Sequence, residues 1–202
     1  MRWIVSTLAV LLVAWAVFLA SPFVSLYRLA GAVEARDVAE IEQRTDMPEV
    51  RANFTRQLIE EYLKSLGKAG AVGGLDRQIA AQTVATLADP LVAQLVTPEA
   101  LIDLLDDGWP QRVVSPEGAP KTPVTFGLGS LARVWGLFVT SETRGFRKVY
   151  IVLPHNRPPE ERFRLLLRLT GTTWRVTAID LPHSLLQNLI KKLPRSAAAA
   201  LQ

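Results

Sequence analysis

The amino-acid sequence predicts an α+β fold. An N-terminal transmembrane helix leads to several helices packed on one face of a roughly four-stranded antiparallel sheet, and an amphipathic helix follows at the C-terminus. Three observations predict it: an uncharged apolar run from Trp3 to Val24, apolar residues with helical spacing up to Leu105, and short apolar runs separated by turn residues from Leu131 onward. Helices followed by a meander of strands form such two-layer domains.

The chain is long enough for one anchor and one soluble domain. It has 202 residues, of which 49% are hydrophobic. We expect an anchor over residues 1–24, a single domain over 25–195 and a disordered tail over 196–202. With no cysteine and only two histidines, the sequence excludes a disulfide framework and a Cys/His zinc site. We expect no cofactor and no metal.

The run from Trp3 to Val24 would form a helix about 33 Å long, which is enough to cross the hydrocarbon core of a bilayer. A cleaved signal peptide is the alternative. Cleavage after Ala20 is disfavoured because Phe18 stands where a small residue is needed and Pro22 follows closely. Residues 14–16 fit the cleavage pattern but lie inside the apolar run. We therefore expect an uncleaved anchor.

The charges that flank the run favour a cytoplasmic amino terminus. Arg2 and the terminal amine precede it, whereas Arg28, Glu34 and Arg36 follow it. We expect a single-pass protein of the bacterial inner membrane with an extracytoplasmic, periplasmic domain. The absence of cysteine is compatible with such an oxidising compartment.

The segment after the anchor predicts helices. Asp37 and Glu40 have the spacing of a capping box, and Pro48 suits the first turn of a longer helix. A further helix should begin near Leu75 and break or kink at Pro90. A short helix should follow the Thr97-Pro98-Glu99 sequence. The longer helix has one apolar stripe, formed by Val50, Phe54, Leu58 and Tyr62.

The second half of the chain predicts strands. The expected strands are Leu131 to Thr140, Arg147 to Leu153, Arg162 to Thr170 and Thr173 to Leu181. Gly171 and Thr172 suit a two-residue hairpin turn between the last two. An amphipathic helix from Ser184 to Leu193 should close the domain.

This hairpin turn predicts a strand register and a basic surface. The expected opposite pairs are Thr170 with Thr173, Arg168 with Arg175, Leu166 with Thr177 and Arg164 with Ile179. The face with Phe163, Trp174 and Ala178 should then meet the helices. The other face carries four arginines, which form a candidate surface for an anionic partner: Arg162, Arg164, Arg168 and Arg175. The alternative is a solvated face that only keeps the sheet soluble.

The charge is distributed unevenly along the chain. Residues 1–111 hold 9 Lys/Arg and 14 Asp/Glu, net −5, whereas residues 112–202 hold 14 and 5, net +9. Outside the cytoplasm nucleic acid is not an expected partner. Besides the membrane itself, anionic lipid, a wall polymer or an acidic protein fits a basic surface better.

The sequence contains no catalytic signature. Asp180, His183 and Ser184 are the residue types of a nucleophilic triad, but they crowd into five positions instead of converging from separate elements. Ser184 and Gln187 fit a capping box for the last helix better. A metal site from His155 with the acids near Asp103 is disfavoured, because these groups lie far apart in the chain.

Several short motifs carry a family resemblance. In order they are Ser21-Pro22, Tyr27-Arg28-Leu29, Ala35-Arg36-Asp37, Asp46-Met47-Pro48-Glu49-Val50-Arg51, Trp174-Arg175-Val176-Thr177 and Leu181-Pro182. This order resembles the bacterial domain-of-unknown-function family 2939 over most of residues 1–182, and the resemblance implies no particular activity. More distantly, the arrangement resembles the nuclear-transport-factor-two-like fold, which hosts both enzymes and interaction modules.

The leading hypothesis is a membrane-anchored envelope protein whose domain is a non-enzymatic binding or interaction module. The alternative is a cone-shaped α+β domain that binds or converts a small molecule in a pocket between helices and sheet. A pocket with Asp180 or His183 would favour the alternative, and a filled apolar core would favour the first hypothesis.

Overall fold

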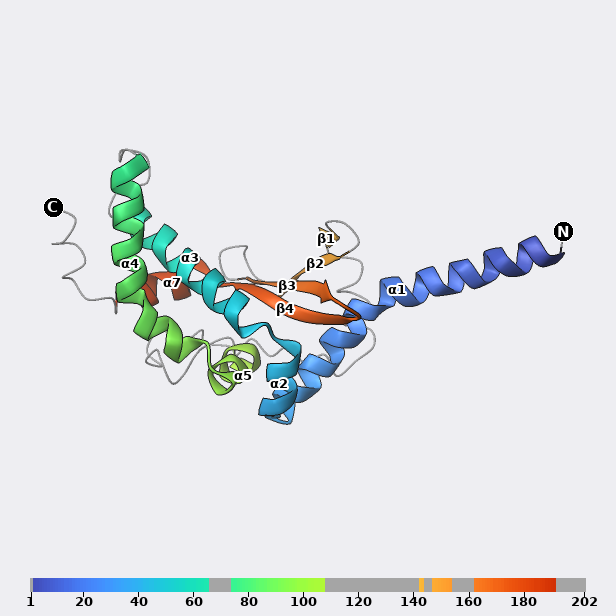
Figure 1. Ribbon diagram of the computed structural model, residues 1–202. Helices are drawn as coiled ribbons and strands as arrows, with labels where there is room; N and C mark the ends of the chain where they lie inside the picture. Colours follow the sequence, from blue (N-terminus) through green and yellow to red (C-terminus); the bar gives the residue numbers. More distant parts are fainter. Residues whose placement is uncertain (1, 66–73, 108–141, 144–146, 154–161, 192–202) are drawn as a thin grey trace.

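A computed structural model describes residues 2–65, 74–107, 142–143, 147–153 and 162–191. The predicted α+β fold class is confirmed, with helices covering one face of an antiparallel sheet (Figure 1). The helices are α1 (Arg2–Glu34), α2 (Val38–Arg44), α3 (Met47–Ser65), α4 (Gly74–Leu95), α5 (Pro98–Asp107) and α7 (His183–Ile190). The strands are β1 (Glu142–Thr143), β2 (Lys148–Leu153), β3 (Phe163–Thr170) and β4 (Thr173–Asp180).

The sheet is a simple meander with strand order β1-β2-β3-β4 and antiparallel neighbours. Three of the expected strands match β2, β3 and β4 to within a residue or two. The expected strand over 131–140 and the expected tail over 196–202 lie outside the described residues. Gly171 adopts a φ of 63° in the β3–β4 turn, a backbone conformation that glycine allows without strain.

The register of the β3–β4 hairpin is only partly as predicted. Arg168 lies opposite Arg175 as expected, but the register shifts between Leu166 and Leu167. Leu166 therefore lies opposite Ala178 instead of Thr177, and Arg164 lies opposite Asp180 instead of Ile179. The extra residue in β4 is Thr177, whose hydroxyl donates to the Leu166 carbonyl at 3.4 Å.

The bulge at Thr177 changes which side chain enters the core. Without it, Ala178 would face the helices and Ile179 would face away from them. With it, Ile179 is 1% exposed and Ala178 is half-buried. The expectation that Ala178 lies on the apolar face is therefore wrong, and the physical reason is that the bulge buries the larger side chain.

The core lies between the sheet and the helices that cover it. Trp174, which was expected to face the helices, is 5% exposed. The apolar stripe predicted for α3 is also buried. The largest fully buried side chains include Phe54, Leu58, Leu101, Ile102, Ile151, Phe163, Leu165 and Leu167.

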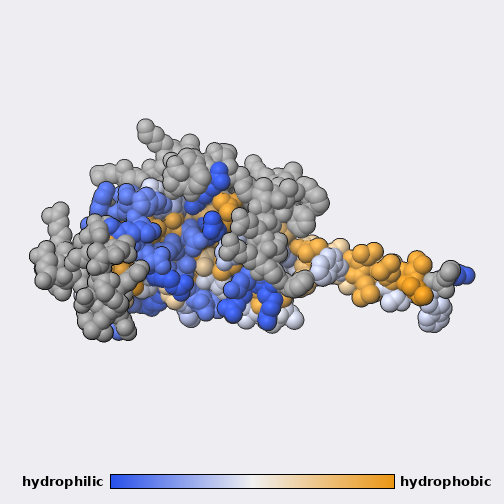
Figure 2. Space-filling model, turned by 90° about the horizontal axis from the view of Figure 1, so that it is seen from above, coloured by the Kyte–Doolittle hydropathy of each residue, from blue (hydrophilic) through white to orange (hydrophobic). Residues whose placement is uncertain are grey.

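One continuous helix, α1, serves both as the apolar N-terminal segment and as a core element. Its first half projects from the domain (Figure 1), and Figure 2 shows it as a largely apolar rod. Trp3 is 89% exposed, whereas Phe23 is 7% and Leu26 1% exposed. Pro22 lies inside the helix. The boundary expected at residue 24 thus falls within an unbroken helix whose burial begins a few residues earlier.

Most predicted helix starts are confirmed by their caps. Asp37 accepts from the Glu40 amide at 3.1 Å, and Thr97 accepts from the Ala100 amide at 3.1 Å. Helix α4 runs through Pro90 to Leu95, so of the break or kink expected there the break is excluded. One expectation is wrong, because α7 begins at His183 after Pro182, with no side-chain cap from Ser184.

The outer edge of β4 is bound by one backbone bridge, between Thr45 and Val176, and by helix side chains instead of another strand. Gln57 of α3 donates to the Ile179 carbonyl and accepts from the Leu181 amide, both at 2.8 Å. Asn53 accepts from the Ile179 amide at 3.2 Å, and Gln57 in turn donates to the Asn53 side-chain oxygen at 2.7 Å. Two amide side chains thus satisfy backbone groups that an exposed edge would leave unpaired.

The buried position of Trp174 predicts a large cost on truncation. Trp174→Ala should lower the free energy of unfolding by about 3 to 5 kcal/mol, since a large side chain leaves the core. Denaturant titration of the full-length protein in detergent measures this. Trp174→Phe is the matched control and should cost less. An unchanged unfolding midpoint for the alanine variant would mean that the indole contributes no packing.

The edge contacts of Gln57 predict a second stability effect. Gln57→Leu leaves the Ile179 carbonyl and the Leu181 amide without their partner and should cost about 1 to 3 kcal/mol. The same titration measures it. Gln82→Leu, at an exposed position on α4, is the control and should change little. Equal stabilities of the two variants would contradict a capping role for Gln57.

Candidate functional site

The predicted arginines do not form a uniform surface. Arg164 and Arg168 are exposed, whereas Arg162 and Arg175 are half-buried. Arg168 lies opposite Arg175 on one side and opposite Lys148 of β2 on the other. These three cations form a row across the sheet, which we call the cationic row.

The strand register pairs like charges near the turn end of the hairpin and opposite charges at its other end. There Arg164 lies opposite Asp180 because of the bulge, although the two side chains form no ion pair. Within the described residues, none of the three cations of the row has an ion-pair partner. In this part of the chain the Arg175 Nε is also buried without a hydrogen-bond partner. Like charges on adjacent strands are mildly destabilising, so an anion beside the row would relieve repulsion.

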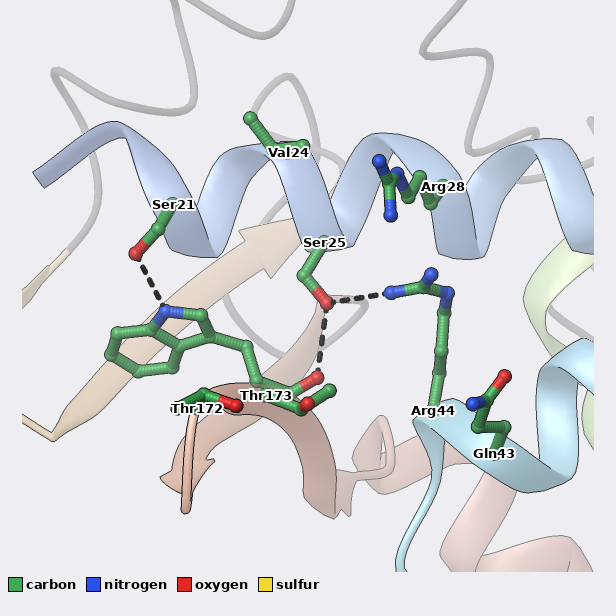
Figure 3. A pocket seen from close by; sticks show the side chains of 9 residues that line it. Ser21, Val24, Ser25, Arg28, Gln43, Arg44, Thr172 and Thr173 are labelled. Carbon is green, nitrogen blue, oxygen red and sulfur yellow. Dashed lines mark hydrogen bonds between the residues drawn. The ribbon is translucent and has the colours of Figure 1, made fainter. Parts of the chain in front are cut away.

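A polar pocket lies on the helix side of the same hairpin turn. It has a volume of about 300 Å³ and is enclosed by one face of α1, the end of α2 and the start of β4 (Figure 3). Ser21, Ser25 and Arg28 are spaced by four and three residues, so they line one face of α1. Gln43 and Arg44 come from α2.

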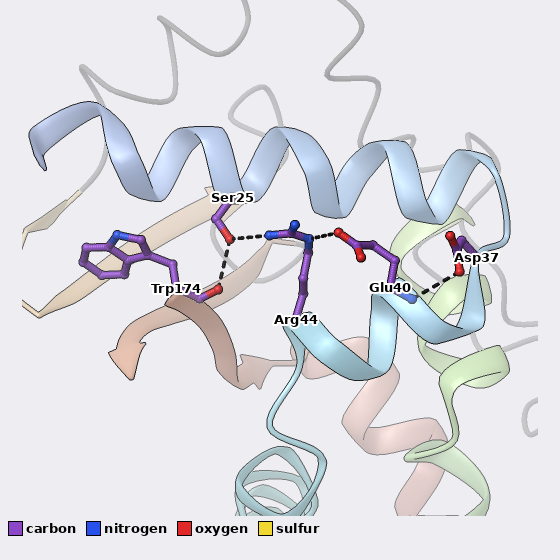
Figure 4. Close-up of polar contacts among 5 residues, drawn as sticks. All are labelled: Ser25, Asp37, Glu40, Arg44 and Trp174. Carbon is purple, nitrogen blue, oxygen red and sulfur yellow. Dashed lines mark hydrogen bonds and ion pairs between the residues drawn. The ribbon is translucent and has the colours of Figure 1, made fainter. Parts of the chain in front are cut away.

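Hydrogen bonds tie the walls of this pocket together. The Trp174 indole donates to the Ser21 hydroxyl at 2.8 Å, and the Ser25 hydroxyl donates to the Trp174 carbonyl at 3.0 Å. Arg44 donates to the Ser25 hydroxyl at 3.3 Å and pairs with Glu40 one turn earlier (Figure 4). The hairpin turn is therefore held at Ser21, next to the exposed apolar half of α1.

The pocket carries positive charge. Its described lining includes Arg28 and Arg44 but no acidic residue. The Arg44 side chain is 11% exposed, and Glu40 neutralises it. Arg28 is exposed and, within the described residues, forms no ion pair. One positive charge in the pocket is thus uncompensated.

The residues considered for a catalytic triad do not come together. His183 Nδ1 lies 3.1 Å from the buried carboxylate of Glu61 on α3, and His183 Nε2 lies 2.9 Å from the Gln187 amide. Asp180 instead accepts from Asn53 at 3.4 Å. The contact between Glu61 and His183 joins α3 to α7, which fits a structural role.

The acidic residues of α5 are bound by an arginine. Arg36 reaches Asp103 at 3.0 Å and Asp106 at 3.7 Å. Among the described residues no group of three or more His, Asp or Glu is arranged to hold a metal ion. His155 lies outside the described residues. Elsewhere, burial raises the pKa of the Tyr62 hydroxyl above its ordinary value, because the phenolate would lose its hydration.

Sequence reasoning missed the pocket. Ser21 was considered only as part of the Ser21-Pro22 motif, and Ser25 was not considered. The signal was their spacing, since two hydroxyl residues four positions apart on an apolar helix mark a polar stripe that needs a partner.

One helix in the described part of the chain is long and apolar enough to cross a membrane. It is α1, in which an 18-residue window has a mean hydropathy of 2.4 and is 0% buried. An exposed apolar helix at the amino terminus is compatible with a single-pass anchor or with a signal sequence.

The comparisons with known proteins agree with the predicted resemblance. A family model described as a protein of unknown function, DUF2939, matches residues 11–104. No curated protein and no solved structure matches the chain, so the likeness to the nuclear-transport-factor-two-like fold is unconfirmed. The matched segment contains the α1 and α2 walls of the pocket. The match supports the assignment of this chain to the DUF2939 family.

Proposed function

We propose that the chain is a single-pass protein of the bacterial inner membrane that holds a non-enzymatic interaction domain at the periplasmic surface. The observation that carries the proposal is the exposed apolar half of α1, which continues into the core without a break. An 18-residue window spans about 27 Å as a helix, close to the thickness of the hydrocarbon core.

Aromatic residues support this placement. Trp3 is 89% and Tyr27 54% exposed, and the two are separated by about 36 Å along the helix. Exposed tryptophan and tyrosine gather at the two interfaces of a bilayer. The spacing suits a span whose ends reach the headgroup layers.

The proposed binding surface is the cationic row of Lys148, Arg168 and Arg175. The hairpin turn beside it is bonded to Ser21. If the first 18 residues of α1, which end at Leu19, cross the hydrocarbon core, Ser21 lies about 3 Å beyond its end along the helix axis. The row therefore lies near the level of the bilayer surface, where each cation gains about 1 kcal/mol from anionic lipid. Among the expected anionic partners, lipid is favoured over a wall polymer or an acidic protein on this ground.

The alternative of a small-molecule or enzymatic domain has less support. It requires a pocket between helices and sheet, but in the described residues that interface is occupied by buried apolar side chains. The polar pocket lies instead beside α1, and neither Asp180 nor His183 lines it.

The natural absence of cysteine allows a clean test of topology. A cysteine at exposed Ser184 should react with a membrane-impermeant thiol reagent in intact spheroplasts. A cysteine inserted between Met1 and Arg2, which keeps the positive charge of Arg2, should react only after permeabilisation. The reverse pattern would place the domain in the cytoplasm.

The purified protein should retain the apolar segment from Trp3 to Val24. Its intact mass, measured by mass spectrometry, should therefore equal that of the uncleaved chain. A mature chain that begins near Trp15 or Ser21 would show signal cleavage.

The cationic row predicts contact with anionic lipid. In nanodiscs, backbone hydrogen exchange across Phe163–Asp180 should be slower with anionic than with neutral lipid, and high salt should abolish the difference. The double variant Arg168→Gln with Arg175→Gln should lose this protection. Arg164→Gln, opposite Asp180, is the matched control and should retain most of it. Identical exchange in both lipids would refute lipid binding by the row.

A further inference from the structure

The described lining of the pocket beside α1 combines two arginines with several other hydrogen-bond donors. Arg28 and Arg44 approach the same space from two helices, and no carboxylate is among the described lining residues (Figure 3). Among the described residues Glu40 pairs with Arg44 and no carboxylate pairs with Arg28, which leaves one positive charge in excess. A bound anion would offset that excess and favour the folded state.

The remaining donors have a chemistry that suits phosphate. The two serine hydroxyls already donate, Ser21 to the Phe18 carbonyl at 2.7 Å and Ser25 to the Trp174 carbonyl at 3.0 Å. Within the described residues, the side chains of Gln43, Thr172 and Thr173 make no hydrogen bond. Arginines, hydroxyls and an amide that converge on one space match the several oxygens of a phosphate group.

The level of the pocket indicates where that phosphate would come from. If the apolar half of α1 crosses the bilayer, Ser21 lies about 3 Å and Arg28 about 14 Å beyond Leu19. The headgroup layer of one leaflet is about 5 to 8 Å thick, so the pocket begins inside it. Val24, which is 51% exposed, provides an apolar contact at the same level.

We propose that this pocket binds the phosphodiester group of an anionic phospholipid in the leaflet from which α1 emerges. The proposal rests on the proposed membrane anchor, but it concerns a different site from the cationic row, on the opposite side of the β3–β4 turn. Arg28 is the principal ligand. Arg44 contributes its remaining N–H groups while Glu40 and Ser25 orient it.

The test measures lipid retained by the full-length protein in nanodiscs that contain neutral and anionic phospholipid, by native mass spectrometry after release. The wild-type protein should retain the anionic lipid selectively. Arg28→Gln should weaken this retention about tenfold, as expected for a lost charge-assisted hydrogen bond. Arg28→Lys should keep much of it. Arg56→Gln, at an exposed position on α3 outside the pocket, is the matched control and should retain as much as the wild type.

Two soluble probes distinguish the source of the phosphate. Inorganic phosphate and a glycerophosphodiester without acyl chains should compete only weakly with the lipid. Strong, Arg28-dependent binding of either soluble probe would overturn the lipid assignment. Equal lipid retention by the wild type, Arg28→Gln and Arg56→Gln would overturn the site itself. Thermal unfolding of each variant confirms that it is folded. The thiol-labelling experiment tests the anchor separately, so failure of the anchor and failure of the pocket give different results.

Discussion

The capping of the outer edge of β4 is the constraint on which the rest of the arrangement depends. β4 is the last strand in the described sheet, and an edge strand with unpaired backbone groups is unstable to wrong pairing. Three separate segments bind this edge. Ser25 of α1 donates to the Trp174 carbonyl, the Asp46 amide donates to the Val176 carbonyl at 2.8 Å, and Asn53 and Gln57 of α3 bind Ile179. These contacts hold α1 and α3 along one strand. They therefore set which faces of the two helices pack in the core and which face of α1 lines the pocket.

Much of this fold follows from local rules that can be read from sequence. The Asp37 cap, the Gly171 turn and the apolar stripe of α3 depend on neighbouring residues, so periodicity and turn chemistry predict them. The bulge at Thr177 could not be predicted in the same way. A strict two-residue period counted from the turn places Ile179 away from the core. Whether Ile179 or Ala178 faces the core depends instead on which side chain packs better against α3, and this long-range contact determines whether the bulge forms. One extra residue then changes the partner of Arg164 from an isoleucine to an aspartate.

The candidate site shows the same division between local and long-range information. The arginines of the hairpin were identified as a basic surface, but their distribution along it depends on the bulge. Arg164 lies opposite Asp180 in the strand register, whereas only cations lie opposite one another near the turn, where Lys148 joins from β2. The pocket depends on contacts between residues about 150 positions apart, such as Ser21 with Trp174. No local pattern predicts which helix face will meet which strand.

The continuity of α1 has a mechanical consequence for any role at a membrane. A flexible linker after a span would let the domain sample many orientations, and charges on its surface would reach the bilayer only part of the time. Here the helix that leaves the apolar segment is also packed in the core through Phe23, Leu26 and Leu29. The orientation of the sheet relative to the helix axis is therefore set by core packing. It follows that the hairpin turn, the cationic row and the pocket are held close to the end of the apolar segment. If α1 spans a bilayer, their contact with lipid needs no reorientation of the domain and costs only the ordering of side chains, so weak electrostatic attraction is more effective.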